Sequence, residues 1–204
     1  MGKSTGDAES NDVARVGTTM EPENMPTVYR VLPDPDEFQS VLADDVKSVM
    51  QYRFDGSTIG EAWQPPVVYS PFPTKQEGDF WSCLSCTFAV SKDAAPSIVK
   101  FLDQSCEVLP LPLGDRTLLL CNVTFVLNCL DEIKSRHKPG LPHWMEEYVF
   151  HPHRFEYSLF KIPQTSMSEV LCAEGLVDGD DGFKATVEKL GLKGLRFQEL
   201  WSDE

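Results

Sequence analysis

Hydrophobic and polar residues alternate with the period of β-strands over much of the chain. Residues 28–32 predict a short strand, and residues 67–69, between prolines, predict an edge strand. Residues 106–113 and 117–127 predict two further strands joined by a turn at Gly114 and Asp115. Because the second of these is apolar on both faces, we expect it near the centre of a sheet.

The end of the chain predicts a helix that leads into a final strand. The apolar face of the helix is formed by Phe183, Val187 and Leu190. Asp180 or Asp181 is expected to cap its first turn, and Gly191 stands where a left-handed residue ends a helix. Beyond it, Leu195 and Phe197 alternate with polar residues, as in a half-buried strand.

Other segments predict helices less regularly. Residues 36–42 predict an amphipathic helix after a proline turn, and residues 46–53 fit either a strand or a helix. Ser91 is expected to cap a helix that runs to Leu102, with Pro96 starting or kinking it. Because strands and helices do not alternate regularly, the predicted fold class is α+β, with a mixed, mainly antiparallel sheet and two to four helices.

Composition divides the 204 residues into a tail and one domain. Residues 1–26 contain almost nothing to bury, so we expect a disordered acidic tail, followed by a single domain over residues 27–204. The net charge of −14 disfavours nucleic acid and anionic membranes as partners and favours a basic protein. No apolar run reaches membrane-spanning length and no signal peptide is apparent, so a cytoplasmic location with reduced cysteines is expected.

Candidate metal ligands lack a complete set. Cys83 and Cys86 have the spacing of half a zinc site, without a second pair. His151 and His153 fall on one side of an extended segment, which leaves a metal pair open as an alternative. Residues 178–189 resemble a calcium loop but end in Lys189 where a glutamate is required. We therefore predict no metal and no cofactor, and the chain carries no motif of a known catalytic class, which predicts a protein that is not an enzyme.

Two acidic segments are candidates for binding a partner protein. Trp144 stands beside Glu146 and Glu147, which predicts a partly apolar, acidic surface anchored by an aromatic ring. Helix capping is the simpler role for Asp178, Asp180 and Asp181, and an exposed acidic patch is the functional alternative.

From Asp79 onward, about two thirds of the chain resembles the bacterial immunity proteins of polymorphic toxin systems, in the group known as immunity family eleven. The resemblance rests on short segments in a shared order, which are residues 88–91 (FAVS), 108–111 (VLPL), 120–123 (LCNV), 127–131 (LNCLD), 159–163 (LFKIP) and 192–197 (LKGLRF). It implies a single-domain cytoplasmic protein that binds and neutralises a cognate toxin. No catalytic residue is implied.

Three functions are therefore compared. The leading one is non-catalytic inhibition of a toxin, which the negative charge suits if that toxin is basic. A metal-dependent enzyme using His151, His153 and Cys83 is one alternative. A homo-oligomeric interaction protein is the other.

Overall fold

The structure, a computed structural model, describes residues 25–84, 86–176 and 181–203. Most of the predicted tail lies outside these residues, and the first strand begins at Thr27. The described residues form an α+β fold in which every paired strand is antiparallel to its neighbour. The predicted fold class is confirmed, although the strands form four sheets and not one.

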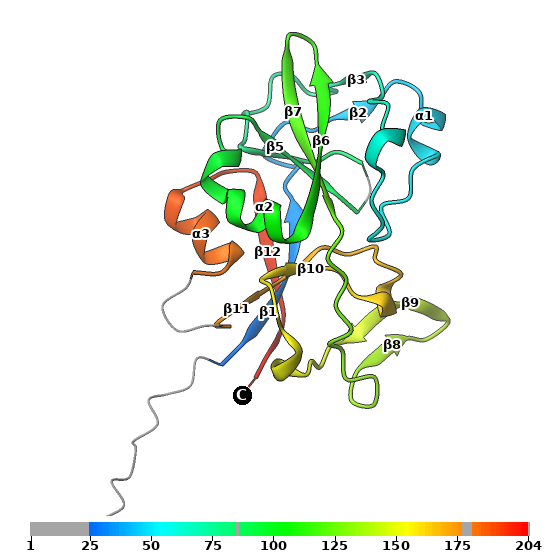
Figure 1. The fold of residues 1–204 in the computed structure, drawn as a ribbon, viewed down its shortest axis with the longest axis vertical. Coiled ribbons are helices and arrows are strands. Elements are labelled where there is room, and N and C mark those ends of the chain that lie inside the picture. The colour runs from blue at the N-terminus through cyan, green and yellow to red at the C-terminus, as the bar shows by residue number, and fades with distance from the viewer. Residues whose placement is uncertain (1–24, 85, 177–180, 204) are drawn as a thin grey trace, which may run out of the picture.

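The first sheet has the strand order β10-β11-β1-β12. Its strands are β1 (Thr27–Pro33), β10 (Leu159–Phe160), β11 (Leu171–Glu174) and β12 (Leu195–Ser202). The strand at the start of the described chain therefore pairs with the last one, and Figure 1 shows the two running together along the molecule. This pairing joins the two ends of the described chain in one sheet.

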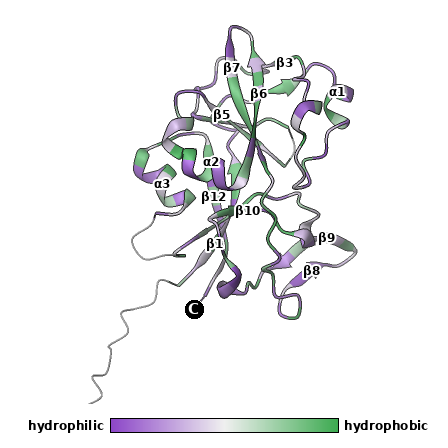
Figure 2. Cartoon of the chain, viewed as in Figure 1, coloured by the Kyte–Doolittle hydropathy of each residue, from purple (hydrophilic) through white to green (hydrophobic). Residues whose placement is uncertain are grey.

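The second sheet has the order β4-β5-β7-β6. Its strands are β4 (Phe80–Trp81), β5 (Phe88–Ser91), β6 (Cys106–Leu113) and β7 (Arg116–Val123). β6 and β7 form the predicted hairpin around Gly114, and β7 has neighbours on both sides, as its apolar sequence predicts. Figure 2 shows hydrophobic residues concentrated on these two strands. β7 ends at Val123, four residues before the predicted end of this strand at residue 127.

Two small sheets complete the described strands. They consist of β2 (Leu42–Ala43) with β3 (Val68–Tyr69), and of β8 (Arg136–Lys138) with β9 (Leu141–Glu147). The α-helices are α1 (Lys47–Met50), α2 (Val99–Ser105) and α3 (Phe183–Leu190). Short 3-10 turns occur at Gly60–Ala62, Ala95–Ile98, Pro152–Arg154 and Pro163–Thr165.

One core cluster lies between both four-stranded sheets and the two longer helices. Val31 of β1, Phe88 of β5 and Phe183 of α3 are buried in it together with Phe101 of α2. The rings of Phe101 and Phe183 meet edge to face, with centroids 5.4 Å apart. The core therefore fixes α2 and α3 against the two sheets.

Gly194, just before β12, allows the two large sheets to approach each other closely. Its φ is +106°, and a Cβ at this position would overlap the carbonyl oxygen of Phe80 in β4. The neighbouring Lys193 carbonyl accepts a hydrogen bond of 2.9 Å from the Phe80 N–H. Only glycine fits both the conformation and the contact.

Two predicted helices differ from the structure. Residues 36–42 form a turn and isolated bridges, because the Asp34 carboxylate accepts the N–H of Asp36 and closes a turn between two prolines. The helix predicted from Ser91 begins as an α-helix only at Val99. Pro96 lies in a 3-10 turn, and the Ser91 hydroxyl accepts the Ala94 N–H at 3.2 Å within the connection from β5.

The final helix confirms the predicted C-terminus and corrects the predicted cap. Gly191 is left-handed, with φ of 68°. The N-cap is Gly182, and Asp181 makes no capping bond; Asp180 lies outside the described residues. The Glu174 carboxylate, from β11, instead accepts the N–H groups of residues 184 and 185 at 2.8 and 3.3 Å. Leu190, expected in the core, is 49% exposed.

Candidate functional site: the Trp144 face

The Trp144 ring lies on the outer side of the β8–β9 hairpin and is 62% exposed. Met145 is the buried residue of β9 and is 5% exposed, whereas its neighbours Trp144 and Glu146 are exposed. The Lys138 ammonium lies 5.6 Å from the centroid of the Trp144 ring, within the range of a cation–π contact. The Trp144 ring is thus exposed, and its role in binding a partner stays a prediction.

Two hollows flank Trp144. One has a volume of about 370 Å³ and extends toward Cys86 and His143. The other has a volume of about 400 Å³ and lies between β9 and β12. Arg30, Trp144 and Glu169 line both, so the tryptophan stands between two concave surfaces. We call the two hollows and Trp144 the Trp144 face.

A hydrogen-bonded group of side chains forms the wall shared by the hollows. Arg30 Nη2 lies 2.6 Å from the Glu169 carboxylate and donates to the Tyr148 hydroxyl at 2.7 Å. Tyr148 in turn donates to Glu169 at 2.7 Å, and Arg30 Nη1 donates to Gln198 at 2.9 Å. Burial and the adjacent Glu169 raise the pKa of Tyr148, so the phenol stays protonated. These contacts link β1, β12, the residue that follows β9 and the segment before β11.

Four glutamates border the hollow between β9 and β12, namely Glu146, Glu147, Glu169 and Glu199. Glu199 lies opposite Tyr29, whose ring contacts Lys184 of α3, so its side chain belongs to the α3 side of the sheet. Glu169 pairs with Arg30, and Glu147 pairs with Arg136 at 2.8 Å. Within the part of the chain that the structure describes, Glu146 and Glu199 form no ion pair. The hollow therefore has negative charge available to a ligand.

The sequence alone did not single out Arg30, Tyr148, Glu169 or Glu199. The first three come together through strand pairing between segments more than a hundred residues apart, which no local pattern reveals. One signal was present: Arg30 is the only charged residue in an otherwise apolar strand. A buried or half-buried charge in such a strand calls for a partner.

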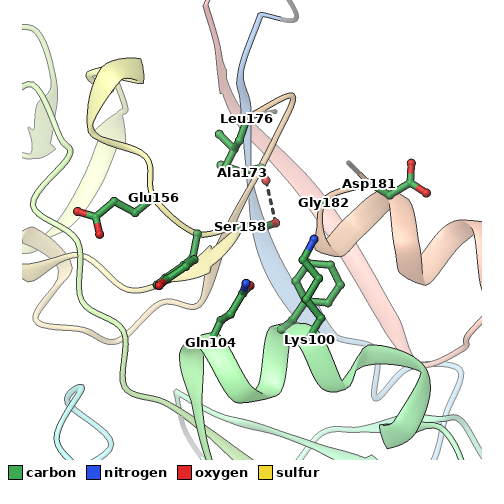
Figure 3. A pocket seen from close by; sticks show the side chains of 10 residues that line it. Lys100, Gln104, Glu156, Ser158, Ala173, Leu176, Asp181 and Gly182 are labelled. Carbon is green, nitrogen blue, oxygen red and sulfur yellow. Dashed lines mark hydrogen bonds between the residues drawn. The ribbon is translucent and has the colours of Figure 1, made fainter. Parts of the chain in front are cut away.

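The acidic segment before α3 lies elsewhere in the molecule. Asp178 and Asp180 lie outside the described residues, and Asp181 pairs with Lys189 at 2.6 Å. Figure 1 shows α3 and β9 on opposite flanks, so the structure does not bring Asp181 to Trp144. Asp181 instead borders a cavity of about 140 Å³, shown in Figure 3, into which Gln104 points, while the carboxylates of Glu156 and Asp181 point away from it.

The cysteine and histidine pairs do not converge. The His151 and His153 rings lie 5.7 Å apart, while the Cys83 thiol contacts the Thr87 hydroxyl at 3.4 Å in another cluster. Burial raises the pKa of Cys83 to about 11, so this thiol is protonated at neutral pH. Among the described residues, no group of three histidine, cysteine, aspartate or glutamate side chains is arranged to hold a metal ion. All six cysteines are free.

A second polar cluster, which we call the clamp, consists of Glu107, Asn122 and Lys161. The Glu107 carboxylate accepts the N–H groups of residues 59 and 60 at 2.8 and 2.6 Å. Asn122 donates to Glu107 and to the carbonyl of Ser57, and Lys161 donates to the carbonyl of Phe54 at 2.6 Å. The clamp fastens the loop of residues 54–60 to β6, to β7 and to Lys161, the residue that follows β10.

Comparison with known proteins adds no relative. No model of a known protein family matches the chain, and no curated protein matches it significantly. In the described part of the chain, no helix combines the length and apolar character needed to cross a membrane.

Proposed function

We propose that this protein is a non-enzymatic inhibitor of the immunity class, which binds a basic toxin protein through the Trp144 face and neutralises it. The observation that carries the proposal is an exposed tryptophan between two hollows, with carboxylates around it. Aromatic residues in such positions supply much of the binding energy of protein interfaces. The sequence resemblance names the class of partner, and the net charge of −14 favours encounter with a basic one.

Binding would act by covering the toxin and not by chemistry on it. The polar groups in the wall of the face are already paired, since Arg30, Tyr148 and Glu169 form hydrogen bonds and an ion pair with one another. Such a group fixes the wall between the two hollows, which lowers the entropy lost on binding. The proposal includes a cytoplasmic protein without metal or cofactor.

Co-expression with the toxin encoded beside its gene tests this proposal. We expect growth to be rescued and a complex to be recovered, and we expect Trp144→Ala to weaken binding by about 2 kcal/mol or more, roughly thirtyfold. Phe72→Ala is the matched control, because Phe72 is 54% exposed and also carries a lysine, Lys75, 4.8 Å from its ring centroid. Phe72 lines neither hollow of the Trp144 face.

Two results would contradict the proposal. The first is the absence of both rescue and complex formation with the wild-type protein. The second is an equal loss of binding in the Phe72 and Trp144 variants, which would show that the loss is not specific to the Trp144 face.

A further inference from the structure

The first sheet ends at β12, and one edge of this strand is unpaired. β12 pairs with β1, and no other described strand pairs with it. The Val31 N–H donates to the Val170 carbonyl on the β11 side of β1, so the backbone groups of the residues on either side of Val31 point toward β12. Their partners in β12, Arg196 and Gln198, are therefore bonded to β1.

The backbone groups of Leu195, Phe197 and Glu199 consequently point away from β1. Among the described residues, no hydrogen bond reaches these groups. The open run is bounded at one end by the close contact of Gly194 with β4, and at the other by Leu200, which is an extra residue in β12 and forms a bulge. β12 therefore offers a short row of unpaired backbone donors and acceptors.

The other edges of the two large sheets are short or covered. β4 and β10 are each two residues long. β6 contains Pro110 and Pro112, which supply no N–H, and the Pro110 carbonyl accepts the Trp63 indole N–H at 2.9 Å. β12 has eight residues, none of which is proline. Among the described strands of these two sheets, it is the long edge that the fold leaves open.

The open edge borders the Trp144 face. Gln198, Glu199 and Leu200 line the hollow between β9 and β12, and Trp144 lines the same hollow. The Glu199 side chain itself belongs to the α3 side of the sheet, next to Tyr29. An extended segment paired with β12 would therefore place alternate side chains toward the hollow and the others beside Glu199.

Resting on the proposed function, we propose that the partner protein adds an extended segment to β12 as a fifth strand of the first sheet. Main-chain hydrogen bonds to Phe197 and Glu199 hold this segment, and its alternate side chains reach the Trp144 face. The net charge of −14 opposes pairing with a second copy of this chain and favours a basic segment. Glu199 forms no ion pair within the described residues, so a lysine or arginine opposite it gains a cross-strand partner.

Amide hydrogen exchange of the full-length protein, with and without the toxin, tests this pairing. In the free protein we expect the amides of Arg196 and Gln198 to be protected by β1 and those of Phe197 and Glu199 to exchange faster. In the complex we expect exchange at Phe197 and Glu199 to slow by about tenfold or more. The two inward amides are internal controls. Unchanged exchange at Phe197 and Glu199 in a complex that forms would overturn the inference.

Two substitutions at one position separate the backbone from the side chain. Glu199→Pro removes the outward N–H, whereas Glu199→Gln keeps the N–H and removes the charge. We expect the proline variant to weaken toxin binding by roughly tenfold and the glutamine variant by roughly twofold to fivefold. Circular dichroism shows whether both variants fold, and exchange in the wild type decides if the proline variant does not. Equal binding by wild type and a folded Glu199→Pro variant would overturn the inference.

A strand peptide tests the edge where no toxin complex is recovered. The probe is acetyl-Lys-Val-Lys-Val-Lys-Val-amide, and the control is the same peptide with every backbone N–H methylated, which cannot donate to a strand edge. We expect saturable shifts of the Phe197 and Glu199 amide resonances in NMR spectra with the probe and none with the control. In that case, no saturable shift or equal shifts with the two peptides would overturn the inference.

The outcomes for the edge and for the proposed function are distinguishable. If the toxin is not bound but the peptide pairs with β12, the edge site stands and the proposed function fails. If the toxin is neutralised but Phe197 and Glu199 stay unprotected in the complex, the function stands and the edge site is overturned. Light scattering of the free protein should show a monomer. A dimer in which these two amides are already protected would assign the edge to a second copy and overturn the inference.

Discussion

The clamp and the Trp144 face contain the same kinds of residue, but these residues have different roles in the two regions. In the clamp, the Lys161 side chain is fully buried, and its ammonium donates to a backbone carbonyl. In the Trp144 face, Lys138 lies over an exposed ring, and the Glu146 carboxylate forms no ion pair within the described residues. Polar groups that are satisfied internally stabilise a fold, whereas those left facing a hollow are available to a ligand.

The two tryptophans of these regions follow the same division. Trp81 lies in the sheet of the clamp and is 1% exposed, while Trp144 is 62% exposed. The comparison therefore predicts that substitutions around the clamp reduce stability and that substitutions on the Trp144 face reduce binding. The following predictions run from the largest expected change in stability to the smallest.

Replacing each tryptophan by alanine should give the largest contrast. We expect Trp81→Ala to lower the free energy of unfolding by about 3–5 kcal/mol, because it leaves a cavity in a packed core. Trp144→Ala should change it by less than about 0.5 kcal/mol. Urea unfolding followed by circular dichroism measures both. Similar losses in the two variants would show that the Trp144 ring is part of the stabilising core.

Comparing the stability of wild type and Lys161→Met at different pH values should show how much burying the charged Lys161 ammonium destabilises the fold. Burial lowers the pKa of Lys161 from 10.5 to about 8, so the unfolded chain holds the proton more tightly. The cost is complete below pH 8 and disappears as pH rises toward 10.5. We therefore expect wild-type stability, relative to the variant, to increase by about 3 kcal/mol across that range.

Chemical unfolding of both proteins at a series of pH values measures this difference. Lys134→Met is the matched control for loss of a lysine, at a side chain that is 71% exposed. Subtracting the variant from the wild type removes the contributions of those buried cysteines that do not interact with Lys161, whereas Cys86 and Cys106 do interact with it. A difference that is independent of pH would contradict a lowered pKa of Lys161 in the folded clamp.

Glu107→Gln should cost about 1–3 kcal/mol, because one hydrogen bond to the loop or to Asn122 loses its acceptor. Glu77→Gln is the control, since that carboxylate is 53% exposed and makes a two-fold contact with Arg116. Thermal unfolding compares the two. We expect the control to lose less than about 1 kcal/mol of unfolding free energy. A larger loss in Glu77→Gln than in Glu107→Gln would show that the clamp contributes less to stability than an exposed ion pair.

Local sequence patterns predict local structure well in this chain. The hairpin of β6 and β7 and the helix ending at Gly191 depend on periodicity and on turn residues that lie next to each other. The failed helix at residues 36–42 had a suitable apolar period, but prolines and the Asp34 side chain favoured a turn. Local competition between side chain and backbone decided that case.

Long-range contacts were not predictable from the sequence. Glu174 caps α3 from another strand, and Glu107 holds a loop more than forty residues earlier in the chain. In the candidate site, Trp144 and Glu146 were predictable because they stand close together in the sequence. Arg30 was not, since its contacts depend on the pairing of β1 with β11 and β12.

Asp181→Asn should have the smallest effect on stability. Because Asp181 lies outside both the clamp and the Trp144 face, this variant tests whether the comparison between them is complete. Its ion pair with Lys189 joins side chains that are 47% and 72% exposed, so we expect a change in stability below about 0.5 kcal/mol. Because α3 and β9 lie on opposite flanks, neutralisation of the toxin should also be unchanged. Urea unfolding and co-expression measure the two quantities. Loss of neutralisation comparable to that of Trp144→Ala would extend the partner surface to α3, and the acidic segment before that helix would then belong to it.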